Sequence, residues 1–177
     1  MSNEPLVITV PSMFCFPPFY EKGDMLYIDK CNFGLCTEKL AQPFFYDILY
    51  ESKVSNSKLW PWQFKESCSI LLKQWDSRKE EISGLLRRRN QQRAREPMCR
   101  SIANFIDLMF WMHHIPVKFE HEITDSFSLL SYRPINVEER LKFILERPDH
   151  YLSFVQLNEL YTECGKKMIV KQAREKK

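Results

Sequence analysis

The chain has 177 residues, of which 44% are hydrophobic and 28% charged, a composition typical of one globular domain with its own core. Its four glycines are scattered singly, which excludes the common glycine-rich phosphate-binding loops. The net charge is only +3, but residues 87–100 and residues 166–177 each contain six basic residues against one acidic residue. The rest of the chain is therefore acidic, with 14 basic and 21 acidic residues.

The beginning of the chain lacks the pattern of a signal peptide, because no basic residue precedes its short apolar run and Pro11 interrupts it early. The most apolar run, residues 105–112, contains Asp107 and is far shorter than the roughly 20 residues that cross a bilayer. We therefore expect a cytoplasmic protein without a transmembrane segment. Its six cysteines are expected to be reduced.

Residues 1–42 combine prolines with aromatic side chains. Prolines restrict the backbone to extended conformations, and aromatic rings adhere to apolar surfaces. This segment is therefore predicted to form an extended proline/aromatic arm packed on the body, with a short strand at residues 6–10. The body is predicted to be a helical domain at residues 43–177, whose last few residues form a basic tail.

Hydrophobic periodicity predicts a compact, single-domain all-α fold, beginning with a short helix at residues 43–53. One long helix is expected at residues 62–92, where apolar residues follow a 3.6-residue period. At 1.5 Å per residue it would be about 45 Å long, with its arginine-rich end projecting. The next helix, residues 96–115, is expected to open at Pro97 and to be central, because it is apolar on most sides.

Two more helices are expected in the last third, after a weak helix or turn at residues 125–131. Asn136 is predicted to cap the first, with Glu139 completing a capping box, and Pro148 separates the two. Apolar residues of the second helix are spaced three and four apart: Phe154, Leu157, Tyr161, Cys164 and Met168. This spacing indicates a seam against a partner helix.

The candidate binding residues are five arginines within one short run: Arg87, Arg88, Arg89, Arg93 and Arg95. Guanidinium groups with interleaved amides suit phosphate and carboxylate partners. Two other interpretations remain open, a solvated helix end and pairing with the acidic body of the same chain. If the run is a binding surface, an acidic protein face is preferred over nucleic acid, because no aromatic residue that could stack on bases lies among these arginines.

Two groups of residues resemble parts of metal sites. His113, His114 and His121 lie close in sequence, but the adjacent pair points about 100° apart on a helix and Pro116 precedes His121. Cys31 and Cys36 supply only half of a zinc site, without a second pair at ligand spacing. We predict neither a bound metal nor a cofactor.

The sequence carries no recognisable catalytic constellation. No nucleophile-elbow glycine pattern surrounds any serine, and the adjacent carboxylates Glu80 and Glu81 belong to a solvated helix face. The chain is therefore predicted not to be an enzyme.

One pattern supports a resemblance to a known family: P-x-N-x-x-E-R-L-x-F-I-x-x-x-P, at residues 134–148, followed by Q-L-x-E-L at residues 156–160. Together with Asn104-Phe105-Ile106, Phe110-Trp111 and Pro116-Val117, it resembles the YpoC-like small proteins of Firmicutes bacteria over about residues 60–170. The resemblance implies an intracellular protein of uncharacterised molecular function, without catalytic residues to carry over. It also implies genes placed near those of a DNA-repair glycosylase and a cell-wall synthase.

Our hypothesis from the sequence is a non-enzymatic cytosolic accessory protein that binds another protein with an acidic face. The alternative is a sequence-independent nucleic-acid-binding accessory of DNA repair or replication, acting through the Arg87–Arg95 run. A second alternative is a hydrolytic or redox enzyme of unrecognised type.

Overall fold

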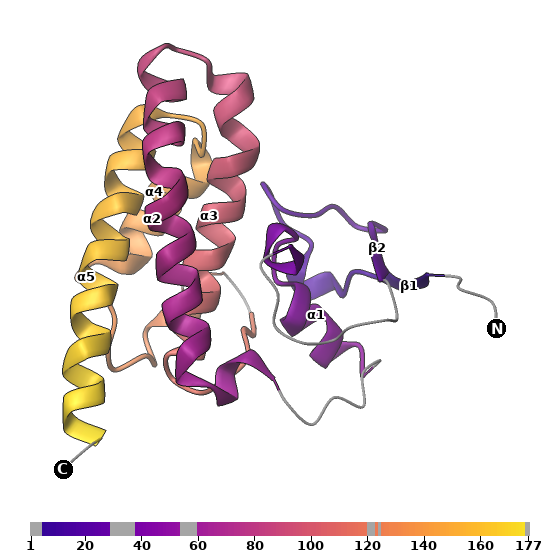
Figure 1. The fold of residues 1–177 in the computed structure, drawn as a ribbon. Helices are drawn as coiled ribbons and strands as arrows, with labels where there is room; N and C mark the ends of the chain where they lie inside the picture. Colours follow the sequence, from indigo (N-terminus) through magenta and orange to yellow (C-terminus); the bar gives the residue numbers. More distant parts are fainter. Residues whose placement is uncertain (1–4, 29–37, 54–59, 120–122, 124, 176–177) are drawn as a thin grey trace.

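The computed structural model describes residues 5–28, 38–53, 60–119, 123 and 125–175. Three helices of 23, 21 and 25 residues lie side by side: α2 (Lys65–Arg87), α3 (Gln91–Trp111) and α5 (Tyr151–Glu175). The shorter helix α4 (Val137–Glu146) packs against α5 (Figure 1). The prediction of a mainly α-helical protein is confirmed.

One long helix is expected at residues 62–92, but the observed helix α2 ends earlier than predicted. Helix α2 stops at Arg87, the chain reverses, and α3 begins at Gln91, so Pro97 lies inside α3 instead of opening it. The reversal occurs because Arg89 adopts a left-handed backbone (φ 57°) and Asn90 caps the next helix. The arginine run therefore forms a helix–helix turn, shown at the top of Figure 1, and does not continue a projecting helix.

The first part of the chain contains a two-stranded antiparallel hairpin, whose second strand was not part of the predicted extended arm. Strand β1 (Leu6–Thr9), close to the predicted strand, pairs antiparallel with β2 (Met25–Ile28), with Leu6 opposite Ile28. Period-two alternation buries Ile8, Leu26 and Ile28 on one face. Gly23, with φ 97°, permits the backbone to turn just before β2.

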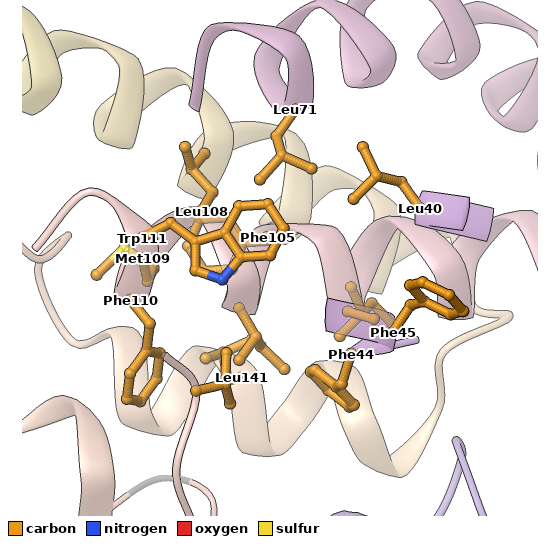
Figure 2. Packing of buried hydrophobic residues seen from close by; sticks show 14 of the residues in the cluster. Leu40, Phe44, Phe45, Leu71, Phe105, Leu108, Met109, Phe110, Trp111 and Leu141 are labelled. Atoms are coloured by element: carbon orange, nitrogen blue, oxygen red, sulfur yellow. The ribbon is translucent and has the colours of Figure 1, made fainter. Parts of the chain in front are cut away.

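Aromatic rings join this hairpin to the helices. Phe14 stacks on Phe44 with ring centroids 5.6 Å apart, and both contact Phe119 edge-on, at 5.8 Å and 5.6 Å. Phe44 directly precedes the short helix α1 (Phe45–Glu51). One hydrophobic cluster extends from Ile8 to Cys164, and Figure 2 shows part of it, with Phe44, Phe45 and side chains of α3 among its members. The hairpin and the helices therefore share a core.

Helix α3 is central, as its sequence predicts, since every residue from Ser101 to Trp111 is buried. The predicted seam of α5 is also confirmed: Leu157 and Cys164 are fully buried, and the ring of Tyr161 stacks on Trp75 of α2 with centroids 4.7 Å apart. Truncating a buried leucine of such a seam to alanine costs about 2–5 kcal/mol.

The predicted capping box at the start of α4 is wrong. Asn136 has a left-handed backbone (φ 52°), and its side chain makes no capping hydrogen bond. The α4–α5 connection is instead stabilised by Arg140, only 16% exposed, which donates to Glu163 (2.6 Å) and to the Gln156 side chain (2.9 Å). Short 3-10 segments complete the described chain: Ser12–Phe14, Lys39–Ala41, Pro61–Gln63 and Asp125–Phe127.

Candidate functional site

The turn between α2 and α3 gathers the five candidate arginines at one end of the helices. The N–H of Asn90 donates to the carbonyl of Leu85 (2.9 Å) and that of Arg89 to Leu86 (3.0 Å), which closes α2 with a Schellman-type pair of bonds. The side chain of Asn90 accepts from the N–H of Arg93 (3.4 Å) and so caps α3. We define the arginine turn as Arg87, Arg88, Arg89, Arg93 and Arg95.

All five arginines of this turn are exposed. Arg95 forms an ion pair with Asp149 at 3.3 Å, with 53% of its side chain exposed. Within the described part of the chain, no carboxylate lies within 4.0 Å of the guanidinium nitrogens of the other four arginines. Pairing with the acidic body therefore accounts for Arg95 among these residues and leaves four guanidinium groups facing solvent.

A hollow of about 470 Å³ lies beside the arginine turn. We name it the turn hollow, and it is lined by Leu86, Arg87, Arg89, Gln91, Asp149, His150 and Tyr151. Its last three residues immediately precede or begin α5, about 60 positions away from the arginines in sequence. Sequence reasoning missed them, because no local pattern indicates that these two segments meet.

A second hollow, of about 600 Å³, lies between the N-terminal segment and α3. Its walls include Phe19 and Tyr27 on one side and Arg95 and Cys99 on the other. Because Arg95 lines this hollow and pairs with Asp149 of the turn hollow, the start of α3 separates the two.

The two adjacent histidines have separate structural partners. Nδ1–H of His113 donates to the carbonyl of Met109 (2.7 Å), and its Nε2 accepts from the N–H of Tyr132 (3.1 Å), an arrangement that requires a neutral ring. Burial lowers the pKa of His113, in agreement with this neutral form. His114 bonds instead to the carbonyl of Trp62 (3.1 Å) and to Lys171 Nζ (3.1 Å).

No group of three metal-ligating side chains occurs among the residues that the structure describes. The remaining candidate ligands, Cys31, Cys36 and His121, lie outside those residues. The described cysteines are free, and burial raises the pKa of Cys68 to about 12 and that of Cys99 to about 11. Thiols with raised pKa values are poor nucleophiles near neutral pH.

Two carboxyl groups lie in the core, Asp47 on α1 and Asp107 on α3, 1% and 2% exposed. Asp47 Oδ1 accepts from the backbone N–H of Val117 (2.6 Å) and from Trp111 Nε1 (3.4 Å). Burial raises the pKa of Asp47 to about 7, although these hydrogen bonds oppose the shift. Burial, and then the charge of Asp47, raise the pKa of Asp107 well above its ordinary value.

The hydrogen bond from Trp111 to Asp47 connects the end of α3 to α1. Because the core encloses both carboxyl groups, a substrate has no access to them. The two hydrogen bonds to Asp47 favour its charged form, and that charge in turn disfavours ionisation of Asp107. The position of Asp107 inside the apolar run 105–112 is a sequence signal that could have indicated its burial. No comparable signal indicated that Asp47 would lie near it.

None of the helices in the described part of the chain combines the length and hydropathy that a bilayer span requires. The fold and surface define the class of protein: a mainly helical domain with a buried carboxyl pair and an exposed arginine-rich turn. The YpoC-like protein family model matches residues 65–176, and the chain belongs to this family. The family assignment from the sequence is therefore confirmed.

The chain is similar to the Uncharacterized protein YpoC of Bacillus subtilis (strain 168), with 31% identity over 111 residues. The match spans 60% of this chain and 65% of that relative's length. No solved structure matches the chain. Helices α2 to α5 and the arginine turn lie within the residues matched by the family model, whereas the N-terminal hairpin precedes them.

Proposed function

We propose that this protein is a non-enzymatic accessory protein that binds an anionic macromolecule through the arginine turn. The observation that carries the proposal is the exposure of four arginines without a carboxylate partner among the described residues. Guanidinium groups remain charged at every physiological pH and donate in pairs to carboxylates and phosphates. A surface of this kind attracts an acidic protein face or the backbone of a nucleic acid.

The surroundings of the nucleophilic residues support the non-enzymatic part of the proposal. The raised pKa values of the described thiols and the enclosure of Asp47 and Asp107 disfavour cysteine or carboxylate catalysis there. Free thiols also suit the reducing cytoplasm, which we propose as the compartment. Turnover that is abolished by alkylating the cysteines would favour the enzyme alternative instead.

The test is a charge-matched pair of variants. In the first, Arg87, Arg88, Arg89 and Arg93 are each changed to Gln, and Arg95 is kept because it pairs with Asp149. The control changes four exposed lysines outside the turn to Gln: Lys22, Lys73, Lys142 and Lys166. Both variants remove four positive charges from a chain of net charge +3. A difference in binding between them therefore depends on where the charges lie and not on the net charge.

Binding is measured by affinity capture from a native lysate at low and moderate salt, with and without nuclease. We expect the wild type and the lysine control to retain the same partner and the arginine variant to lose it, with unchanged helical circular dichroism. Capture of the same partner by the arginine variant would exclude the arginine turn as the binding surface.

A further inference from the structure

The turn hollow brings together two kinds of side chain that the sequence keeps apart. Arg87 and Arg89 line it from the arginine turn, and His150 and Tyr151 line it from the start of α5. Its volume of about 470 Å³ falls within the range of small-ligand sites, roughly 300–1,000 Å³. A hollow of this size is large enough for one nucleotide.

The charge of the hollow favours an anion. Arg87 and Arg89 are exposed and have no carboxylate within 4.0 Å among the described residues. Among the described residues that line the hollow, the only acid is Asp149, whose carboxylate is paired with Arg95 at 3.3 Å. Two guanidinium groups therefore remain to bind a phosphate group there.

The aromatic wall is held in place by the core. Tyr151 is 37% exposed, and its ring lies 6.0 Å from that of buried Phe154, at an interplanar angle of 32°. Phe154 in turn lies 5.7 Å from Trp75 of α2. His150 is fixed locally, because its Nδ1 accepts from the N–H of Leu152 (3.4 Å). An exposed ring supported in this way is a ready stacking surface with little conformational entropy to lose.

We propose that the turn hollow binds single-stranded nucleic acid, with backbone phosphates on Arg87 and Arg89 and one base stacked on Tyr151. This inference rests on the proposed function and specifies its partner. An acidic protein segment would bind the arginines, but its carboxylates would make no stacking interaction with an exposed aromatic ring. Every nucleic-acid base, in contrast, has a flat face that can stack on such a ring. A duplex keeps its bases stacked inside, so it would use only the arginines.

The proximity of Tyr151 also removes the reason for preferring a protein partner in the sequence. That preference depended on the lack of aromatic residues among the arginines in the sequence. The packing of α5 against α2 supplies the missing ring from another segment. Arg88 and Arg93 are exposed on the same turn and add positive charge near the hollow.

The test measures fluorescence anisotropy of a labelled oligothymidylate of about 15 nucleotides, and of a duplex of the same length, with the full-length protein. Four variants are compared: Tyr151→Leu, Tyr151→Phe, Phe143→Leu as an exposed aromatic outside the hollow, and the arginine variant defined above. Thermal unfolding of each variant controls for folding.

We expect the wild type to bind the single strand at least about tenfold more tightly than the duplex, and Tyr151→Leu to lose about tenfold in affinity for the single strand. Tyr151→Phe and Phe143→Leu should bind like the wild type, and the arginine variant should lose binding to both. Equal affinity for single strand and duplex, or wild-type affinity of Tyr151→Leu, would overturn the inference.

The outcomes separate this inference from the proposed function. If the arginine variant loses its captured partner while no oligonucleotide binds the wild type, the arginine turn binds an acidic protein, and only the nucleic-acid inference fails. If the arginine variant captures its partner like the wild type, the proposed function fails, whatever the effect of Tyr151→Leu.

Discussion

The buried carboxyl pair and the arginine turn place charged groups in opposite surroundings. Asp47 and Asp107 lie in the core, where burial raises the pKa of each, and Asp47 is held by two hydrogen-bond donors. Four arginines of the turn are exposed and have no carboxylate partner among the described residues. The first region uses polar groups to fix the chain, whereas the second leaves its charges available to a partner.

This difference follows from solvation. A buried donor without an acceptor costs about 1–3 kcal/mol, so a polar group in the core strongly affects the free energy of unfolding. An exposed charge is stabilised by water, and its substitution changes stability by less than about 0.5 kcal/mol. Substitutions in the core should therefore act on folding, and substitutions in the turn should act on binding.

The largest effect is expected for Asp47→Ala. This change leaves the N–H of Val117 and Nε1–H of Trp111 without their acceptor, and should lower the free energy of unfolding by about 3 kcal/mol. Urea denaturation at about pH 6, below the pKa of about 7, measures it with Asp47 mostly protonated. Arg87→Ala is the comparison, with an expected change below about 0.5 kcal/mol. Similar losses for both variants would break the contrast between the two regions.

A smaller effect is expected from pH. The pKa of Asp47 is raised from 3.8 to about 7, so between these values the folded protein holds a proton that the unfolded chain has released. The contribution of Asp47 to stability is therefore present at low pH and is lost as pH rises through about 7. The slope cannot exceed about 1.4 kcal/mol per pH unit for one group.

His113 acts in the opposite sense, since its lowered pKa reduces stability as pH falls below its ordinary value of 6.5. The difference between the wild type and Asp47→Asn cancels this contribution. We expect the wild type to lose about 2 kcal/mol relative to Asp47→Asn between about pH 5 and 7, measured by urea denaturation. Parallel pH profiles of the two proteins would contradict the raised pKa.

The smallest effect is expected at the turn itself. Arg89 has a left-handed backbone, which glycine adopts without a steric penalty, so Arg89→Gly should raise the free energy of unfolding by about 0.5–1 kcal/mol. Arg88 is the matched control, because its φ of −81° needs no glycine and Arg88→Gly should lower stability by about as much. Thermal denaturation measures both, and equal shifts would indicate that the Arg89 backbone carries no strain.

The periodic parts of the fold could be predicted from the sequence. Phe154, Leu157, Tyr161 and Cys164 recur on one face of α5, and this spacing alone identified the buried seam. The end of α2 could not be predicted in the same way, because the arginine run contains neither glycine nor proline, and only Asn90 indicated a cap. The paired strand of the hairpin was missed because 15 residues separate β2 from β1.

The sequence by itself determined the helical class, the central position of α3 and the concentration of arginines at residues 87–95, since each depends on neighbouring residues along one helix or turn. Only the tertiary structure decided that Tyr151 and Arg87 line the same hollow and that Asp47 and Asp107 share the core. Those arrangements depend on which helix faces meet, such as Tyr161 of α5 stacked on Trp75 of α2. The packing of the whole chain fixes such contacts, because they join residues between 60 and 86 positions apart.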